Sequence, residues 1–199
     1  MKINKIVTQS VLFLGLGAAV LSAQAATLNL GDLLTINSGV PVYDTNGNIT
    51  IVSNGSWYGL DVDMNGSVDA KAIMTQGTTG LMIGIPQIDG EIDAPTTFFT
   101  TSVHHTSIAI TGDTVNGLDF SGWRWSFLSN DINMGSGAWG AGFTNGKANI
   151  SWDGVYGHAY TLDYAATIPS PDPCNCGPAS YRLHLEGTVV ASPVPVPAA

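Results

Sequence analysis

The feature that most restricts the fold of this chain is the strict alternation of apolar and polar residues in several short segments. The longest segment has apolar residues at every second position: Tyr160, Leu162, Tyr164, Ala166 and Ile168. Another segment has Tyr181, Leu183 and Leu185 on one face, with Arg182, His184 and Glu186 on the other. Successive side chains of a β-strand point to opposite sides of the sheet, so a period of two indicates strands with one buried face.

Shorter β-rich runs, separated by turn residues, continue this pattern along the chain. They lie at residues 27–36, 40–43, 48–52, 81–85, 107–111 and 148–152. Asn46-Gly47 stands between two of these runs and favours the tight turn of an antiparallel hairpin. Residues 70–76 are expected to form one or two helical turns, which Gly77 ends. The sequence therefore predicts an all-β domain over residues 26–191, an antiparallel β-sandwich (jelly-roll-like or Ig-like) with little helix.

The densest group of core candidates lies at residues 118–127. Its apolar members are Leu118, Phe120, Trp123, Trp125 and Phe127. The spacing changes from even to odd positions between Phe120 and Trp123, which one regular strand cannot accommodate without an extra residue. We therefore predict a β-bulge near Gly122. Because the tryptophans alternate with other apolar residues, most of the five are expected in the core and not on a sugar-binding platform.

The two ends of the chain carry targeting features. Lys2 and Lys5 precede an apolar run at residues 11–21, and Ala23-Gln24-Ala25 fits a small-residue cleavage site. Residues 1–25 are therefore predicted to be a signal peptide, and the protein to be exported. Residues 192–199 form a Pro-rich tail that cannot continue a strand ladder, because Pro lacks the N–H donor. A net charge of −9 argues against nucleic acid as a partner.

An acidic segment at residues 61–69 has the spacing of a calcium-binding loop. Its oxygen ligands would be Asp61, Asp63, Asn65, Ser67 (through its carbonyl) and Asp69, with Gly66 at the sharp turn. Val68 would tether the loop to the core, and the loop would fix the entry to the strand at Leu81. The residue at position 12 is Ala72, so the bidentate ligand is missing. The alternative is an acidic turn that closes a hairpin, since Asp, Asn and Gly are common turn residues.

A second acidic cluster at residues 89–93 could lend a carboxylate to the same ion, although a solvated loop is the simpler interpretation. Cys174 and Cys176 lie in a Pro- and Gly-rich loop, and three interpretations remain open for them. They could form a strained local disulfide, bond to another chain, or supply half of a metal site. The histidines at 104, 105, 158 and 184 lack ligand spacing and are expected to be surface or hydrogen-bonded residues.

The tail Val194-Pro195-Val196-Pro197-Ala198-Ala199 resembles the V-P-x-P-A-A variant of the PEP-CTERM sorting signal. The body also resembles PEP-CTERM surface proteins, in the acidic Asn-Gly loop and at Gly55-Ser56-Trp57, Ser121-Gly122-Trp123, Gly135 to Trp139, Trp152 to Gly157 and Leu183 to Val189. The resemblance implies sorting by an exosortase-type machinery to the outer surface of a Gram-negative bacterium. Such signals continue into an apolar helix and a basic cluster, so the sequence is expected to be truncated before them or cut at the signal. The resemblance also implies Glu at position 72, where this chain has Ala.

These features together predict a secreted or cell-surface structural or interaction protein with a structural calcium loop, in extracellular matrix or biofilm. One alternative is a carbohydrate-binding module for exopolysaccharide, which needs exposed, coplanar aromatic rings. Another is a self-assembling surface fibre subunit, in which a strand of one copy completes the sheet of the next. An enzyme is not expected, because the residues supply no recognisable set of acid, base and nucleophile.

Overall fold

The computed structural model describes residues 26–135, 146–168 and 177–192. Within these ranges the protein is all-β, with antiparallel sheets packed together and no helix, so the predicted fold class is confirmed. The predicted signal peptide, Trp139, both cysteines and the tail from residue 193 lie outside the described residues.

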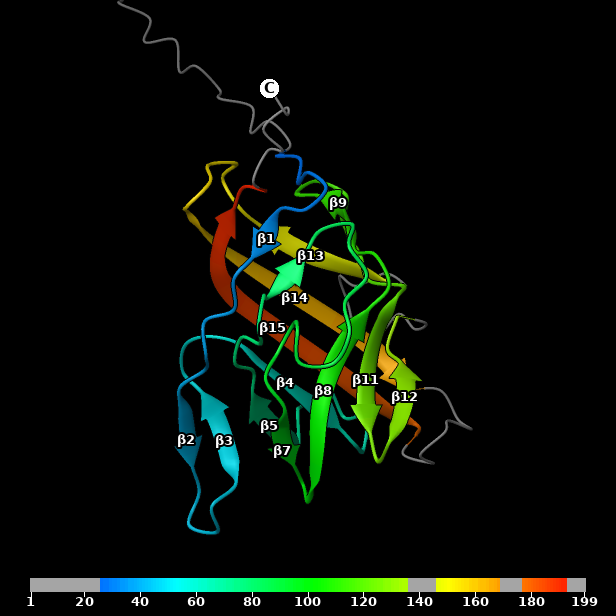
Figure 1. Ribbon diagram of the computed structural model, residues 1–199. Helices are drawn as coiled ribbons and strands as arrows, with labels where there is room; N and C mark the ends of the chain where they lie inside the picture. Colours follow the sequence, from blue (N-terminus) through cyan, green and yellow to red (C-terminus); the bar gives the residue numbers. More distant parts are fainter. Residues whose placement is uncertain (1–25, 136–145, 169–176, 193–199) are drawn as a thin grey trace, which may run out of the picture.

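The larger sheet has nine strands, seven of them in the order β5-β4-β15-β14-β13-β10-β9. Their bounds are β4 Trp57–Asp61, β5 Ala70–Ile73, β9 Thr111–Asp113, β10 Gly117–Asp119, β13 Lys147–Ser151, β14 Ala159–Ile168 and β15 Ala179–Val190. Two short strands complete it: β1 (Leu33–Leu34) pairs with β15 and with β6 (Leu81–Met82). The long strands β14 and β15 cross the middle of the molecule (Figure 1).

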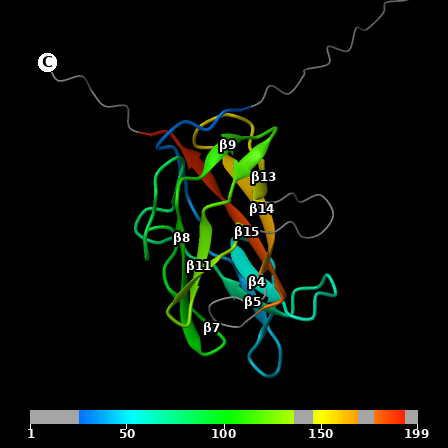
Figure 2. The same cartoon turned by 90° about the vertical axis from the view of Figure 1, so that its right-hand side faces the viewer.

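The smaller sheet has four strands, in the order β12-β11-β8-β7. Their bounds are β7 Thr96–Phe98, β8 Thr101–Ser107, β11 Trp123–Phe127 and β12 Asn130–Asn133. Figure 2 shows the two layers side by side, with β8 and β11 on the left and β14 and β15 on the right. The predicted Asn-Gly hairpin is confirmed as β2 (Pro41–Tyr43) paired with β3 (Ile49–Val52).

The core lies between the two layers and is rich in aromatic rings. Trp123 and Trp125 of β11 are fully buried, as are Tyr164 of β14 and Tyr181 of β15. Phe120 contacts Trp123 and Tyr164, with ring centroids 5.1 and 4.9 Å apart. The predicted alternation in β14 and β15 is also confirmed, because the residues assigned to the inner face are buried.

The sequence was misleading at two elements. Residues 70–73 form the strand β5 and not a helical turn, because pairing with β4 overrides the local helix preference of Ala-Lys-Ala. The predicted β-bulge near Gly122 is also wrong. Phe120 directly follows β10, which pairs with β13 in the larger sheet, whereas Trp123 begins β11, which pairs with β8 in the smaller one. The spacing changes because the chain crosses between layers at Ser121-Gly122.

Two further boundaries differ from the sequence prediction. The first predicted strand, at residues 27–36, is reduced to β1, with an isolated bridge from Thr27 to Asp113. The strand predicted at residues 107–111 is divided between the end of β8 and the start of β9. A turn at Leu30-Gly31 interrupts the first of these runs, and a bend at Ile108 interrupts the second.

Candidate metal centre

The acidic segment connects β4 to β5 and closes a hairpin of the larger sheet. Asp61 is the last residue of β4, and the backbone N–H of Asp69 donates to the carbonyl of Leu60. The chain turns back at Met64 and Gly66, whose φ angles are 57° and 95°. Glycine adopts such angles without steric cost, which explains its place at the turn. The calcium-loop and hairpin-turn interpretations therefore do not exclude each other, because the acidic loop is itself the turn of the β4–β5 hairpin.

Carboxylates of the loop accept hydrogen bonds from its own backbone. The two oxygens of Asp61 accept from the N–H groups of Asn65 (3.1 Å) and Gly66 (2.8 Å). Asp69 Oδ2 accepts from the N–H of Val62 at 2.8 Å. Asp63 Oδ1 accepts from the N–H of Asn65 at 3.1 Å. These bonds direct the three carboxylates inward over a short stretch of chain.

One oxygen from each of Asp61, Asp63 and Asp69 lies within 4.8 Å of the others. Asp61 is buried, whereas Asp63 and Asp69 are exposed. None of the three forms an ion pair with a basic side chain in the described part of the protein. At such distances each pair of charges repels by about 1 to 4 kcal/mol, depending on the local dielectric. A hard cation that prefers oxygen ligands, such as Ca²⁺, would replace this repulsion by attraction.

The structure brings together the carboxylates of three of the five predicted ligands, and the other two, Asn65 and Ser67, lie in the same loop. The Asn65 amide nitrogen donates to Asp63 Oδ2 at 2.8 Å, and the Asn65 amide oxygen accepts from the N–H of Ser67. The Asn65 amide oxygen therefore already accepts one hydrogen bond within the loop and keeps one lone pair for a cation. Ser67 is exposed and follows this turn, so its carbonyl belongs to the same loop.

Three details of the sequence-based site are corrected. Ala72 lies in β5 opposite Tyr58 and is only 3% exposed, so position 12 faces the core and not the loop. Val68 packs over Gly59, where an added Cβ would lie 2.5 Å from the Val68 Cγ1 atom. Because Gly59 lies on the outer face of the sheet, Val68 fixes the loop there and not in the core. The strand that the loop introduces is β5, not the one at Leu81.

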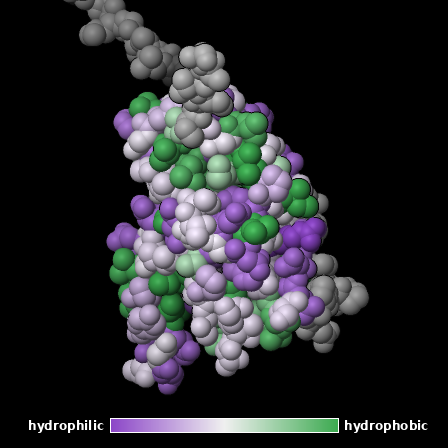
Figure 3. All heavy atoms as spheres, viewed as in Figure 1, coloured by the Kyte–Doolittle hydropathy of each residue, from purple (hydrophilic) through white to green (hydrophobic). Residues whose placement is uncertain are grey.

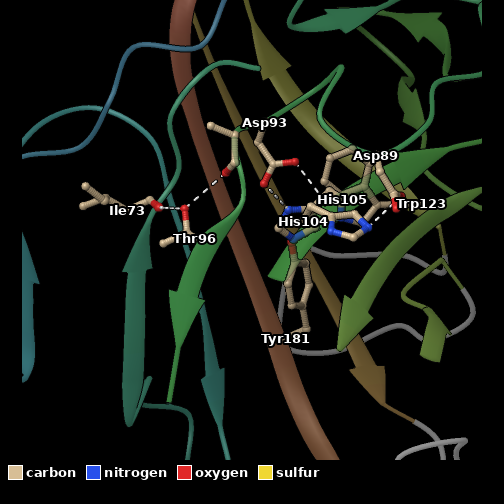
Figure 4. Close-up of polar contacts among 9 residues, drawn as sticks. Ile73, Asp89, Asp93, Thr96, His104, His105, Trp123 and Tyr181 are labelled. Atoms are coloured by element: carbon tan, nitrogen blue, oxygen red, sulfur yellow. Dashed lines mark hydrogen bonds and ion pairs between the residues drawn. The ribbon is translucent and has the colours of Figure 1, made fainter. Parts of the chain in front are cut away.

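The second acidic cluster is solvated at Asp89, as the simpler interpretation expected, but not at Asp93, and both carboxylates contact histidines. Asp89 contacts His104 at 2.6 Å, and Asp93 is fully buried against His105. In Figure 4 both carboxylates point toward the histidines of β8. They therefore supply no ligand to the acidic loop in this arrangement.

His105 is the centre of a buried polar network that the sequence did not reveal. Its Nδ1 lies 2.8 Å from Asp93 Oδ2, and its Nε2 lies 2.9 Å from the hydroxyl of Tyr181. The indole N–H of Trp123 donates to the same hydroxyl at 3.2 Å. Trp is only a donor, so every proton has an acceptor if Tyr181 donates to Nε2 and Nδ1–H donates to Asp93. Burial raises the pKa of Tyr181 well above its usual value.

The outer face of the larger sheet carries a second histidine cluster. His184 Nδ1 lies 2.7 Å from Asp163 Oδ1, and His184 Nε2 lies 3.1 Å from Glu186 Oε1. The hydrogen bond to Asp163 raises the pKa of His184, although partial burial opposes it. The hydrogen bond to His184 in turn lowers the pKa of Glu186. Both histidine networks thus hold hydrogen-bonded structural residues, as the sequence predicted.

The described tryptophans offer no pair of open rings. Trp123 and Trp125 are fully buried, and Trp152 is 8% exposed. Trp57 is covered by His184, whose ring stacks at 6.2 Å, and by Lys71, whose ammonium lies 4.7 Å from the ring centre. Exposed apolar residues are interspersed with polar ones in the view of Figure 3.

An open groove lies beside the acidic loop, between the β2–β3 hairpin, β5 and β7. It has a volume of about 940 Å³. Tyr43 and Phe99 line it and are 58% and 62% exposed. Asp69 and Lys71 also border it. The groove therefore combines aromatic and charged groups next to the carboxylate cluster.

Comparison of this chain with family models, curated proteins and solved structures finds no match. Within the described ranges, no helix is long and apolar enough to cross a membrane.

Proposed function

We propose that the protein is an exported β-sandwich whose β4–β5 loop binds Ca²⁺ as a structural clamp. The observation that carries this proposal is the convergence of the Asp61, Asp63 and Asp69 oxygens within 4.8 Å on one hairpin. A cation at this point stabilises the folded hairpin, because the unfolded chain does not hold the three carboxylates together.

The place of action is the cell exterior, in a structural or interaction role in matrix or biofilm and not a catalytic one. The leader-like residues 1–25 and the Pro-rich residues 192–199 support export and sorting by an exosortase-type machinery. The exterior also suits a calcium clamp of modest affinity, since extracellular sites bind Ca²⁺ with dissociation constants of about 0.1 to 1 mM.

Calorimetric titration of the folded protein with CaCl₂ tests the proposed ion. We expect one Ca²⁺ per chain and at least about tenfold weaker binding in Asp63→Asn, which keeps the turn but removes a charge. Asp113→Asn is the matched control, because Asp113 also accepts from its own turn, at Val115 and Asn116. Equal calcium affinity in the wild type and Asp63→Asn would contradict the proposal.

The groove supports a second candidate function, the binding of exopolysaccharide. Sugars combine apolar ring faces with hydroxyl groups, and the groove offers Tyr43 and Phe99 together with Asp69 and Lys71. Retardation of the protein in gels that contain exopolysaccharide tests this role. Tyr43→Ala and Phe99→Ala are expected to abolish the retardation, whereas unchanged retardation in both variants would exclude the groove.

A further inference from the structure

A buried serine of the central strand lies beside the acidic loop. Ser180 of β15 is the direct partner of Asp61 in the antiparallel pairing of β15 with β4. Residues directly opposite in such a pair have side chains on the same face, with Cβ atoms about 5 Å apart. Both residues are fully buried. The Ser180 side chain therefore lies on the same face of the sheet as the one carboxylate of the cluster that is shielded from solvent.

The Ser180 hydroxyl has no hydrogen-bond partner, although its oxygen is inaccessible to solvent. A buried hydroxyl without a partner is unfavourable, so such groups normally contact another polar group, a water or an ion. The backbone N–H groups of Asn65 and Gly66 already occupy one position on each Asp61 oxygen. A neutral hydroxyl oxygen beside a carboxylate is a suitable ligand for a hard cation.

We propose that Ser180 supplies a ligand oxygen to the cation held by Asp61, Asp63 and Asp69, which rests on the calcium binding proposed above. The ligand comes from β15 because position 12 of the loop, Ala72, faces the core. The ion then joins the β4–β5 loop to the longest strand of the larger sheet. This strand-borne ligand replaces the one that a helix following the loop would provide.

Calcium titration of Ser180→Ala tests the proposal, and Ser107→Ala is its matched control. Ser107 of β8 has a buried hydroxyl that also has no partner, but it belongs to the smaller sheet. We expect Ser180→Ala to bind Ca²⁺ about tenfold more weakly and Ser107→Ala to bind it like the wild type. In chelator Ser180→Ala is expected to melt no lower than the wild type, because no hydrogen bond is lost.

The outcomes separate the two proposals. Calcium binding by the wild type with the same affinity in Ser180→Ala overturns the role of Ser180 and leaves the loop site intact. Absence of calcium binding by the wild type overturns both. In Ser180→Asp a fourth carboxylate joins the cluster, so we expect a lower melting temperature in chelator and a larger rise with CaCl₂. A Ser180→Asp variant that melts alike in both conditions contradicts the proposal.

Discussion

At the scale of single residues, the two histidine networks show how position decides what a polar side chain does. His105 and His184 both contact a carboxylate, but His105 is buried between the layers and His184 lies on the outer face. Alternation in β15 predicted the outer position of His184. It could not predict the burial of Asp93, because an acidic turn residue becomes a core residue only through its partner on another strand.

The pKa of His184 predicts how stability depends on pH. Because this pKa is raised, the ion pairs of His184 stabilise the folded protein fully below the unfolded pKa of about 6.5. This stabilisation is lost as the pH rises through the pKa of the folded state. The pKa of Glu186 is lowered, so Glu186 stabilises the folded protein above pH 4.5 and loses this effect as the pH falls through its folded pKa. We expect His184→Gln to destabilise the protein by about 1 kcal/mol or less at pH 5.5, and by less at pH 8. Equal losses at both pH values, measured by urea unfolding, would contradict this interpretation.

The Tyr181 hydroxyl is predicted to contribute more than a typical hydrogen bond. Tyr181→Phe leaves both the His105 Nε2 atom and the Trp123 indole N–H without a partner in the core. We expect a loss of about 2 to 4 kcal/mol in the free energy of unfolding. Tyr58→Phe is the control, because the Tyr58 hydroxyl is equally buried and has no partner. Removing that hydroxyl is expected to be neutral or stabilising, and a loss as large as that of Tyr181→Phe would contradict the account.

At the scale of elements, the β4–β5 hairpin shows the limit of matching a motif. The spacing of Asp61, Asp63 and Asp69 correctly indicated carboxylates that converge. The same pattern placed Ala72 at a ligand position, because it assumes that a helix follows the loop. Strand pairing with Tyr58 decides the direction of that side chain, and local sequence does not contain this information.

The variant Ala72→Glu distinguishes the strand from the helix. A calcium loop followed by a helix would gain affinity from this carboxylate, because a bidentate Glu occupies position 12 of such loops. In β5 the side chain faces the core opposite Tyr58, so the charge would be buried without a partner. We expect unchanged or weaker calcium binding and a loss of about 2 kcal/mol or more in stability. Tighter calcium binding by this variant would show that position 72 faces the loop.

At the scale of the whole molecule, the sequence predicted the fold class but not the order of the strands. Alternation is a local property and is visible in β14 and β15 without any knowledge of their neighbours. The order of strands depends on contacts between distant segments, such as β4 with β15. The crossing between layers at Ser121-Gly122 was therefore mistaken for an irregularity within one strand. The proposed cation would bind where β4, the acidic loop and β15 meet.

Thermal unfolding of the folded protein in excess CaCl₂ and in chelator tests the central claim most directly. At a free calcium concentration of 100 times the dissociation constant, one bound ion adds about 2.7 kcal/mol of stability. For a domain of this size, that corresponds to a rise of roughly 5 to 10 °C in the melting temperature. We expect this rise in the wild type and in Asp113→Asn, and a much smaller one in Asp63→Asn. Identical melting temperatures of the wild type in calcium and in chelator would contradict the calcium clamp.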